Sequence, residues 1–137
     1  MAAETFTATL SASPASIGRA RRGLQQRLHE WGCGNAADIA LVFSELVTNA
    51  IVHTGSAPSV QVTHGEGVVR IDVHDHAQSV PMLRDADAAP GGYGMHIVDQ
   101  ICDSWGWEQN PTGKTVWSVV RCSRPISGEA ADGAARS

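Results

Sequence analysis

Aromatic side chains, an excess of basic charge and long apolar runs are all scarce in this sequence of 137 residues. Aromatic residues make up 5% of it, which is little for a surface that stacks on sugars or bases. The formal charge of -4 argues against nucleic acid as a direct partner. No apolar run approaches the roughly 20 residues of a membrane span, and the N-terminus lacks the pattern of a signal peptide. We therefore expect no membrane segment and a cytoplasmic protein.

Cysteine is also sparse, and the three cysteines have no short spacing between them. Cys33, Cys102 and Cys122 include no C-x-x-C pair, so we expect no disulfide framework and a reducing compartment. A zinc site needs about four ligands that usually come in short pairs. His74 and His76 are close in sequence, but a shared face of one strand explains their spacing. A thiol or metal protein therefore stays an alternative that the spacing does not favour.

The apolar content of 42% is enough for one folded domain. Because most of the expected strands are joined as hairpins, we predict an α+β fold with helices on one face of a mixed, mostly antiparallel sheet. We expect this domain to span residues 1–121, and the small and polar residues of 122–137 predict a disordered tail. Apolar periodicity predicts strands at residues 5–10, 59–63, 68–75, 104–109 and 114–121, and helices at 14–31, 35–53 and 93–102.

Short local signals mark the starts of the two long helices and the turn of one hairpin. Ser13 precedes Pro14, a pattern that predicts a capped helix start with proline in the first turn. Asn35 offers a similar cap for the second helix. The glycines in residues 64–67 predict a hairpin turn between the second and third strands.

Three polar residues of the second expected helix, Glu45, Asn49 and His53, are candidates for chemistry. Their spacing of four places them in a row on one side of the helix, beside its apolar stripe. A carboxylate can accept a proton from a hydroxyl group, and an amide oxygen is a hard ligand for Mg²⁺. The spacing also fits an ordinary solvated flank, so it does not decide between the two interpretations.

Two further features lie around the long segment 76–92, which has no periodicity. Asp75 ends a strand there and could accept the amino group of a purine, or could simply cap the loop. The glycines of residues 91–94 precede a helix, where backbone N–H groups and the helix dipole favour phosphate. Gly113-Lys114-Thr115 looks like half of a P-loop, but it opens a strand and fits a hairpin turn better.

Taken together, these pieces resemble the GHKL (histidine-kinase-like) ATPase superfamily. The most specific piece is E-L-V-x-N-A-x-x-H over residues 45–53, followed in order by Asp75, the Gly92–Met95 segment and a G-K-T-V-W stretch over residues 113–117. Within the superfamily, the sequence is most similar to the small bacterial anti-sigma-factor serine kinases, and the resemblance covers residues 6–120. It implies the Bergerat fold, a two-layer α/β sandwich.

The resemblance also implies roles for individual residues. Glu45 corresponds to the catalytic base, Asn49 to the Mg²⁺ ligand and Asp75 to the carboxylate that contacts the adenine amino group. The glycines lie beside the phosphates of ATP, Thr115 lies near the adenine, and His53 has a supporting role. The implied nucleotide-binding residues are Asn49, His53, Asp75, Gly92, Gly94, Met95 and Thr115.

The implied activity is transfer of the γ-phosphate of ATP to a serine of a STAS-type anti-anti-sigma partner, with reversible sequestration of a sigma factor. A homodimer is also common in this family. One departure supports a second hypothesis: the family usually has D-x-G-x-G where this chain has Asp75-His76-Ala77-Gln78-Ser79. Loss of both glycines changes what the loop can adopt beside a nucleotide. The alternative is therefore a non-enzymatic protein-binding module with weak or no nucleotide binding.

Overall fold

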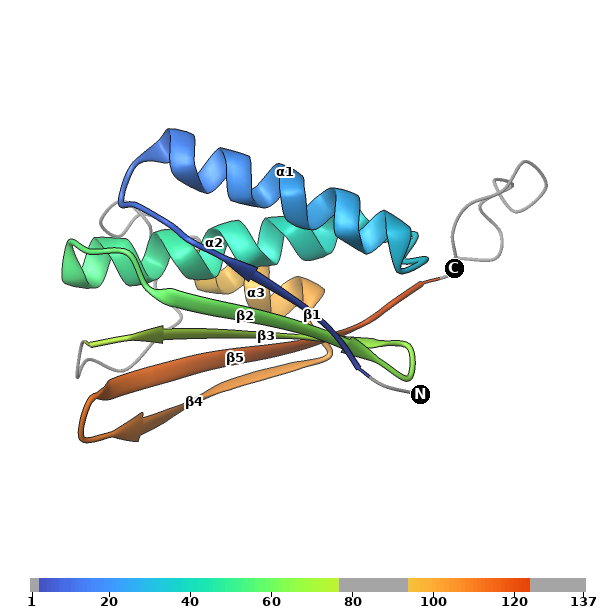
Figure 1. Cartoon of the computed structure of the whole chain (residues 1–137). Helices are drawn as coiled ribbons and strands as arrows, with labels where there is room; N and C mark the ends of the chain where they lie inside the picture. The colour runs from blue at the N-terminus through green and yellow to red at the C-terminus, as the bar shows by residue number, and fades with distance from the viewer. Residues whose placement is uncertain (1–2, 77–93, 124–137) are drawn as a thin grey trace.

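Strands and helices follow one another along the chain in the order that the apolar patterns predict. The computed structural model describes residues 3–76 and 94–123 (Figure 1). The strands are β1 (Glu4–Ala8), β2 (Ser59–Gly65), β3 (Val68–Asp75), β4 (Ser104–Asn110) and β5 (Gly113–Arg121). The helices are α1 (Pro14–Glu30), α2 (Ala36–Thr54) and α3 (Gly94–Ile101). The predicted Gly92 and the departures at 77–79 lie outside the described residues.

The five described strands form one sheet in the order β1-β2-β3-β5-β4. Every pair of neighbouring strands in it is antiparallel, and β5 lies between β3 and β4. The three helices lie together on one face of this sheet (Figure 1). α2 packs against α1, α3 and β3, which makes it the central element of the helical layer. The predicted α+β, two-layer sandwich is confirmed.

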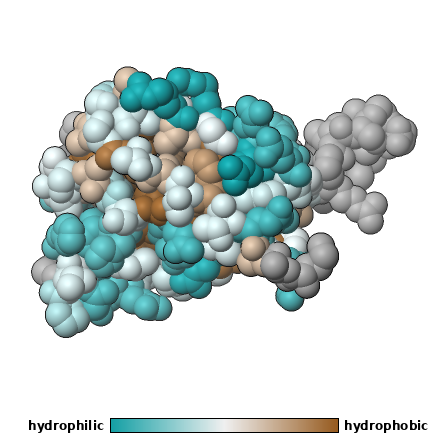
Figure 2. All heavy atoms as spheres, in the orientation of Figure 1, coloured by the Kyte–Doolittle hydropathy of each residue, from teal (hydrophilic) through white to brown (hydrophobic). Residues whose placement is uncertain are grey.

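The core lies between the two layers and follows the side-chain alternation of the strands. In β3, Val69, Ile71 and Val73 are buried, while Arg70 between them is exposed. An apolar stripe along α2 covers these residues. On the face shown in Figure 2, apolar side chains also gather between α1 and the edge of the sheet, surrounded by hydrophilic ones.

α2 is long and apolar enough, by length and composition alone, to cross a membrane. Half of its residues are buried inside the fold, against the sheet and the other helices. Burial in the core of the sandwich therefore accounts for its apolar character.

The two long helices begin in different ways. The Ser13 hydroxyl accepts a hydrogen bond from the Ser16 N–H at 3.2 Å, as the sequence predicts. Asn35 does occupy the N-cap position of α2, but its side chain makes no capping bond. It donates instead to the Arg121 carbonyl at 2.9 Å and accepts from the Ser123 N–H at 3.0 Å. Asn35 therefore joins the start of α2 to the end of β5.

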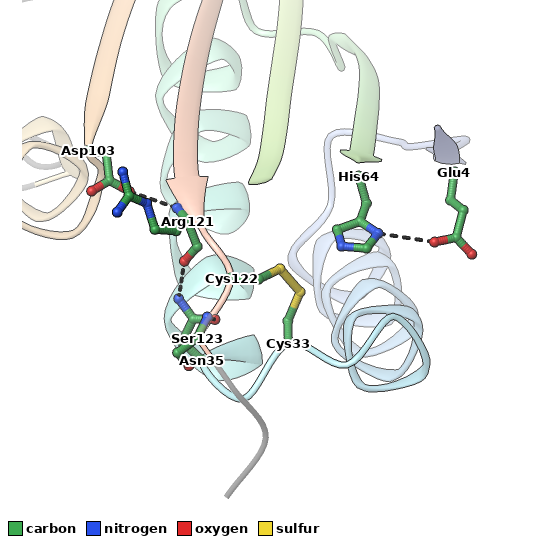
Figure 3. The surroundings of a disulfide bond; sticks show 8 residues. All are labelled: Glu4, Cys33, Asn35, His64, Asp103, Arg121, Cys122 and Ser123. Atoms are coloured by element: carbon green, nitrogen blue, oxygen red, sulfur yellow. Dashed lines mark hydrogen bonds and ion pairs between the residues drawn. A yellow bond between two sulfur atoms is a disulfide. The ribbon is translucent and has the colours of Figure 1, made fainter. Parts of the chain in front are cut away.

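The expectation that the cysteines form no disulfide is wrong. Cys33, between α1 and α2, is bonded to Cys122, which directly follows β5 (Figure 3). The two cysteines are 89 residues apart in sequence, and their Cα atoms are 4.9 Å apart. The sheet order, which brings the end of β5 back to the α1–α2 connection, creates this proximity. The spacing of the cysteines along the chain does not predict this disulfide.

The folded region extends two residues beyond the boundary at residue 121 that we expected. The Cys122 N–H donates to the Gly67 carbonyl at 2.8 Å, and the Gly34 N–H donates to the Ser123 carbonyl at 2.9 Å. Cys122 and Ser123 are therefore part of the domain. Residues 124–137, which we expect to be a disordered tail, lie outside the described residues.

Candidate functional site

The polar row on α2 lies at the border between the core and the surface. Glu45, Asn49 and His53 are all half-buried, whereas Thr48 and Val52 on the adjacent flank are exposed. Burial raises the pKa of Glu45 above its ordinary value of 4.5, and the positive charge of Arg21 on α1 partly opposes this effect. A fully solvated helix flank would not raise the pKa of a carboxyl group.

This geometry gives the row a definite chemical capacity. A carboxylate with a raised pKa is a better proton acceptor near neutral pH than an ordinary glutamate. The amide of Asn49 lies one helical turn further along the same side of α2. Its oxygen, together with a neighbouring carboxylate, provides the hard oxygen donors that Mg²⁺ prefers. The residues present therefore fit a proton acceptor beside a magnesium-bound phosphate.

Asp75 lies at the end of β3, on the sheet face that the helices cover, and its side chain is only 3% exposed. The Lys114 ammonium group donates to its two carboxylate oxygens at 3.1 and 3.0 Å. The Lys114 side chain is 1% exposed, so the two residues form a buried ion pair. The strand register places Lys114 directly opposite Asp75.

Gly113 lets the start of β5 approach Asp75 closely. Its φ of +143° suits glycine, and a Cβ at this position would overlap the Asp75 carbonyl oxygen. The turn between β4 and β5 also contacts the end of β3, because the Thr112 carbonyl oxygen lies 3.0 Å from the His76 ring nitrogen Nδ1. The end of β3 and the start of β5 therefore form one fixed unit around the ion pair.

The structure does not bring Thr115 together with Asp75. Side chains alternate along β5, so Thr115 lies on the outer face of the sheet while Lys114 lies on the helix-covered face. The Thr115 hydroxyl is 3.0 Å from Nδ1 of His74, which also lies on the outer face. Lys114, and not Thr115, therefore accompanies Asp75 on the face where α2 lies.

The glycine segment is only partly described. Gly94 is the first residue of α3, and Met95 is buried in the hydrophobic core with 2% exposure. α3 packs against α2, so the start of α3 belongs to the same helical layer as the polar row. The structure thus assigns Met95 a packing role.

Lys114 is the residue of this region that sequence reasoning missed. Its position within G-K-T looked like half of a phosphate-binding loop, but a hairpin turn explained it better. Its partner is 39 residues away, on a strand that is not adjacent in sequence. The signal that could have found it is that the only lysine of the sequence lies on the inward-facing side of a predicted strand. A buried lysine requires an acidic partner, so this position predicts an ion pair.

Comparisons with known proteins agree with this architecture. The family model of the histidine kinase-like ATPase domain matches residues 10–120. The comparison with curated proteins finds no match. Among solved structures, the RsbU and RsbW domains of Rv1364c from Mycobacterium tuberculosis are 25% identical, with a TM-score of 0.64 over 91% of this chain. This match covers 33% of that chain, so the protein described here spans about a third of its length.

A second solved structure is the histidine kinase domain of the blue-light activated histidine kinase from Erythrobacter litoralis EL346. It is 20% identical, with a TM-score of 0.49 over 79% of this chain and 60% of that chain. The family match extends from the loop before α1 into β5 and includes the polar row, the ion pair and α3. The chain belongs to the histidine kinase-like ATPase family.

Proposed function

We propose that this protein is a cytoplasmic, ATP-dependent serine kinase of the anti-sigma type. It transfers the γ-phosphate of ATP to a serine of a STAS-type anti-anti-sigma partner and thereby controls the availability of a sigma factor. The observation that carries the proposal is the half-buried Glu45 with a raised pKa, one turn from Asn49 on the same side of α2. The family match supports the nucleotide-binding fold around these residues.

Each residue of the row has a separate task in this proposal. Glu45 accepts the proton of the serine hydroxyl as the oxygen attacks the γ-phosphorus and the β–γ bridging oxygen leaves with ADP. Asn49 would hold Mg²⁺ through its amide oxygen, where the ion would supply positive charge to the phosphates. Asp75 accepts a hydrogen bond from the adenine amino group through a carboxylate oxygen.

A groove beside the row suits the protein partner. It is lined mainly by apolar groups of the start of α1 and of α2, including Ile17, Ile51 and Val52, together with Arg21. Val52 is 57% exposed, which is high for a large apolar side chain. A partner segment docked there would bring its serine along α2 towards Glu45.

The decisive experiment separates nucleotide binding from phosphate transfer. We expect isothermal titration calorimetry of the full chain with Mg-ADP to show binding, and Glu45→Gln to preserve it. With radiolabelled ATP and a STAS-domain protein, Glu45→Gln is expected to slow transfer about 10²- to 10⁴-fold because the proton acceptor is lost. Glu30→Gln, at an exposed carboxyl on α1, is the matched control and should leave transfer unchanged.

One observation favours a second candidate function, a non-enzymatic protein-binding module. The buried Lys114 ammonium group already contacts both oxygens of Asp75, the carboxylate proposed for adenine. In that case Mg-ADP at millimolar concentration would give neither binding heat nor a higher melting temperature, while a STAS-domain protein would still form a complex. That combination would eliminate the kinase proposal.

A further inference from the structure

Three side chains that can bind metal meet at the end of the molecule where α2 begins. They are Cys33 from the α1–α2 connection, His64 near the end of β2 and Cys122 after β5 (Figure 3). One ligand atom from each lies within 4.8 Å of the others. Cys33 is buried, and the other two are half-buried. Sulfur and imidazole nitrogen are the donors that zinc prefers.

The backbone holds the two cysteines in place independently of the bond between them. The Cys33 N–H donates to the Leu28 carbonyl at 2.9 Å, and the Cys122 N–H donates to the Gly67 carbonyl at 2.8 Å. Asn35 adds two bonds to the chain on either side of Cys122. These contacts do not involve sulfur, so reduction of the disulfide breaks none of them directly.

His64 is oriented as a metal ligand. Its Nδ1 lies 3.0 Å from a carboxylate oxygen of Glu4, and its ring stacks on Trp31 with centroids 5.1 Å apart. A carboxylate only accepts hydrogen bonds, so Nδ1 carries a proton, and in the neutral imidazole Nε2 is then the nitrogen with the lone pair. Figure 3 shows the side of the ring away from Glu4 turned towards the two sulfurs. A carboxylate behind the histidine is the usual support of a zinc ligand.

We propose that the reduced protein binds one Zn²⁺ through Cys33, Cys122 and His64, with water at the fourth position. The disulfide and the metal site are alternative states of the same two cysteines. Reduction by a phosphine adds two electrons and two protons to the disulfide, and the phosphine takes up oxygen from water. Zinc then replaces the two thiol protons. In the reverse direction, hydrogen peroxide accepts two electrons and two protons and forms two waters, while the disulfide forms and zinc leaves.

This site is separate from the proposed kinase site. Cys122 follows the last residue of β5, whereas Lys114 lies at the start of that strand, opposite Asp75 at the end of β3. Zinc binding can therefore be tested without nucleotide or protein partner. Its failure would leave the proposed function unaffected.

The test is a cobalt titration of the full chain, first oxidised and then reduced with phosphine and freed of it under anaerobic conditions. Cobalt bound by thiolates shows charge-transfer absorption and the strong visible bands of a tetrahedral site. We expect these bands in the reduced protein, saturating at one cobalt per chain and disappearing on addition of Zn²⁺. The oxidised protein should show none. Absence of the bands from the reduced protein would overturn the proposal.

Variants identify the ligands. Cys33→Ser and Cys122→Ser should abolish the charge-transfer bands, whereas Cys102→Ser, outside the cluster, should leave them unchanged. Burial raises the pKa of the Cys102 thiol to about 11, which disfavours the thiolate form that binds metal. Bands that depend on Cys102 would contradict the assignment.

The histidine is tested through its exposed carboxylate partner, because that change leaves the core untouched. Glu4→Gln should weaken cobalt binding about 10- to 100-fold while the circular dichroism spectrum is unchanged. His64→Gln should weaken it further, with His29→Gln on the surface of α1 as control. Equal affinities of the wild type and the His64 variant would remove His64 from the ligand set.

Discussion

The two ends of α2 are stabilised in different ways. At its N-terminal end, which we call the cystine end, Cys33, Asn35 and Cys122 connect three segments through a disulfide and backbone hydrogen bonds. At its C-terminal end, which we call the carboxylate end, β3 ends and β5 begins (Figure 1), and Asp75 and Lys114 form a buried ion pair between these two strands. The first arrangement uses neutral groups, and the second uses charge.

The difference shows which end of the molecule responds to oxidation and reduction and which end responds to a change of charge. Neutral hydrogen bonds at the cystine end are insensitive to pH, but the two sulfurs can exchange a covalent bond for a metal. At the carboxylate end, every change of charge alters stability, because burial makes an isolated charge costly. Glu45, between the two ends, is partly buried and already shows a raised pKa. Titratable groups with shifted pKa values gather at functional sites.

The largest expected effect is at the carboxylate end. Lys114→Met leaves the Asp75 carboxylate buried without its ammonium partner, so we expect a loss of about 3–5 kcal/mol in the free energy of unfolding. Urea denaturation followed by circular dichroism measures this loss. Asp75→Asn combined with Lys114→Met removes both charges and should recover most of the stability. A single variant as stable as the wild type would show that the pair is not buried in solution.

Reduction of the disulfide is the corresponding change at the cystine end. The bond closes a loop of 89 residues, and constraint of the unfolded chain by such a loop is typically worth about 2–4 kcal/mol. We expect this loss when a phosphine reduces the protein in the presence of EDTA, which keeps the cysteines free of metal. Urea denaturation of Cys102→Ser, oxidised and reduced, provides the control because this variant keeps the disulfide. Addition of zinc in place of EDTA should restore part of the loss.

A smaller effect is expected for the hydrogen bonds at the same end. Asn35→Ala removes two side-chain bonds, to Arg121 and Ser123, each worth about 0.5–1.5 kcal/mol. We expect the melting temperature of the oxidised protein to fall modestly, and amide exchange to accelerate at Ser123. Asn110→Ala, which removes the turn contacts of Asn110 to Thr112 at the other end of β5, is the matched control. It should leave the exchange of Ser123 unchanged.

Sequence analysis was least informative about contacts between residues far apart in the chain, which occur at both ends. Local patterns predicted the element order, the Ser13 cap and the α2 polar row, because each depends on residues within a few positions. The disulfide, the ion pair and the bonds of Asn35 to the end of β5 join residues 39 to 89 positions apart. They depend on the strand order, which places β5 beside β3 and returns its end to the start of α2. The side-chain alternation along β5 predicts that Lys114 and Thr115 lie on opposite faces of the sheet. The family motif, however, gave the binding role to Thr115.

The smallest expected effect concerns the pH dependence of stability between the two ends. Because burial raises the pKa of Glu45 in the folded state, folding favours its protonated form. The contribution is fully present below about pH 4.5, the ordinary pKa, and is lost as the pH rises through the higher pKa of the folded protein. The neutral amide of Glu45→Gln does not ionise, so this residue's contribution to the free energy of unfolding does not change with pH.

The free energies of unfolding of the wild type and Glu45→Gln, measured from pH 4.5 to 7, isolate this contribution, because the other titrating groups cancel in their difference. The variant should gain stability relative to the wild type as the pH rises. Glu30→Gln, which removes an exposed carboxyl group of α1, is measured over the same range as the matched control. A flat difference for Glu45→Gln would mean that Glu45 is solvated in both states. The row on α2 would then be an ordinary surface flank, and the kinase proposal would lose the observation that carries it.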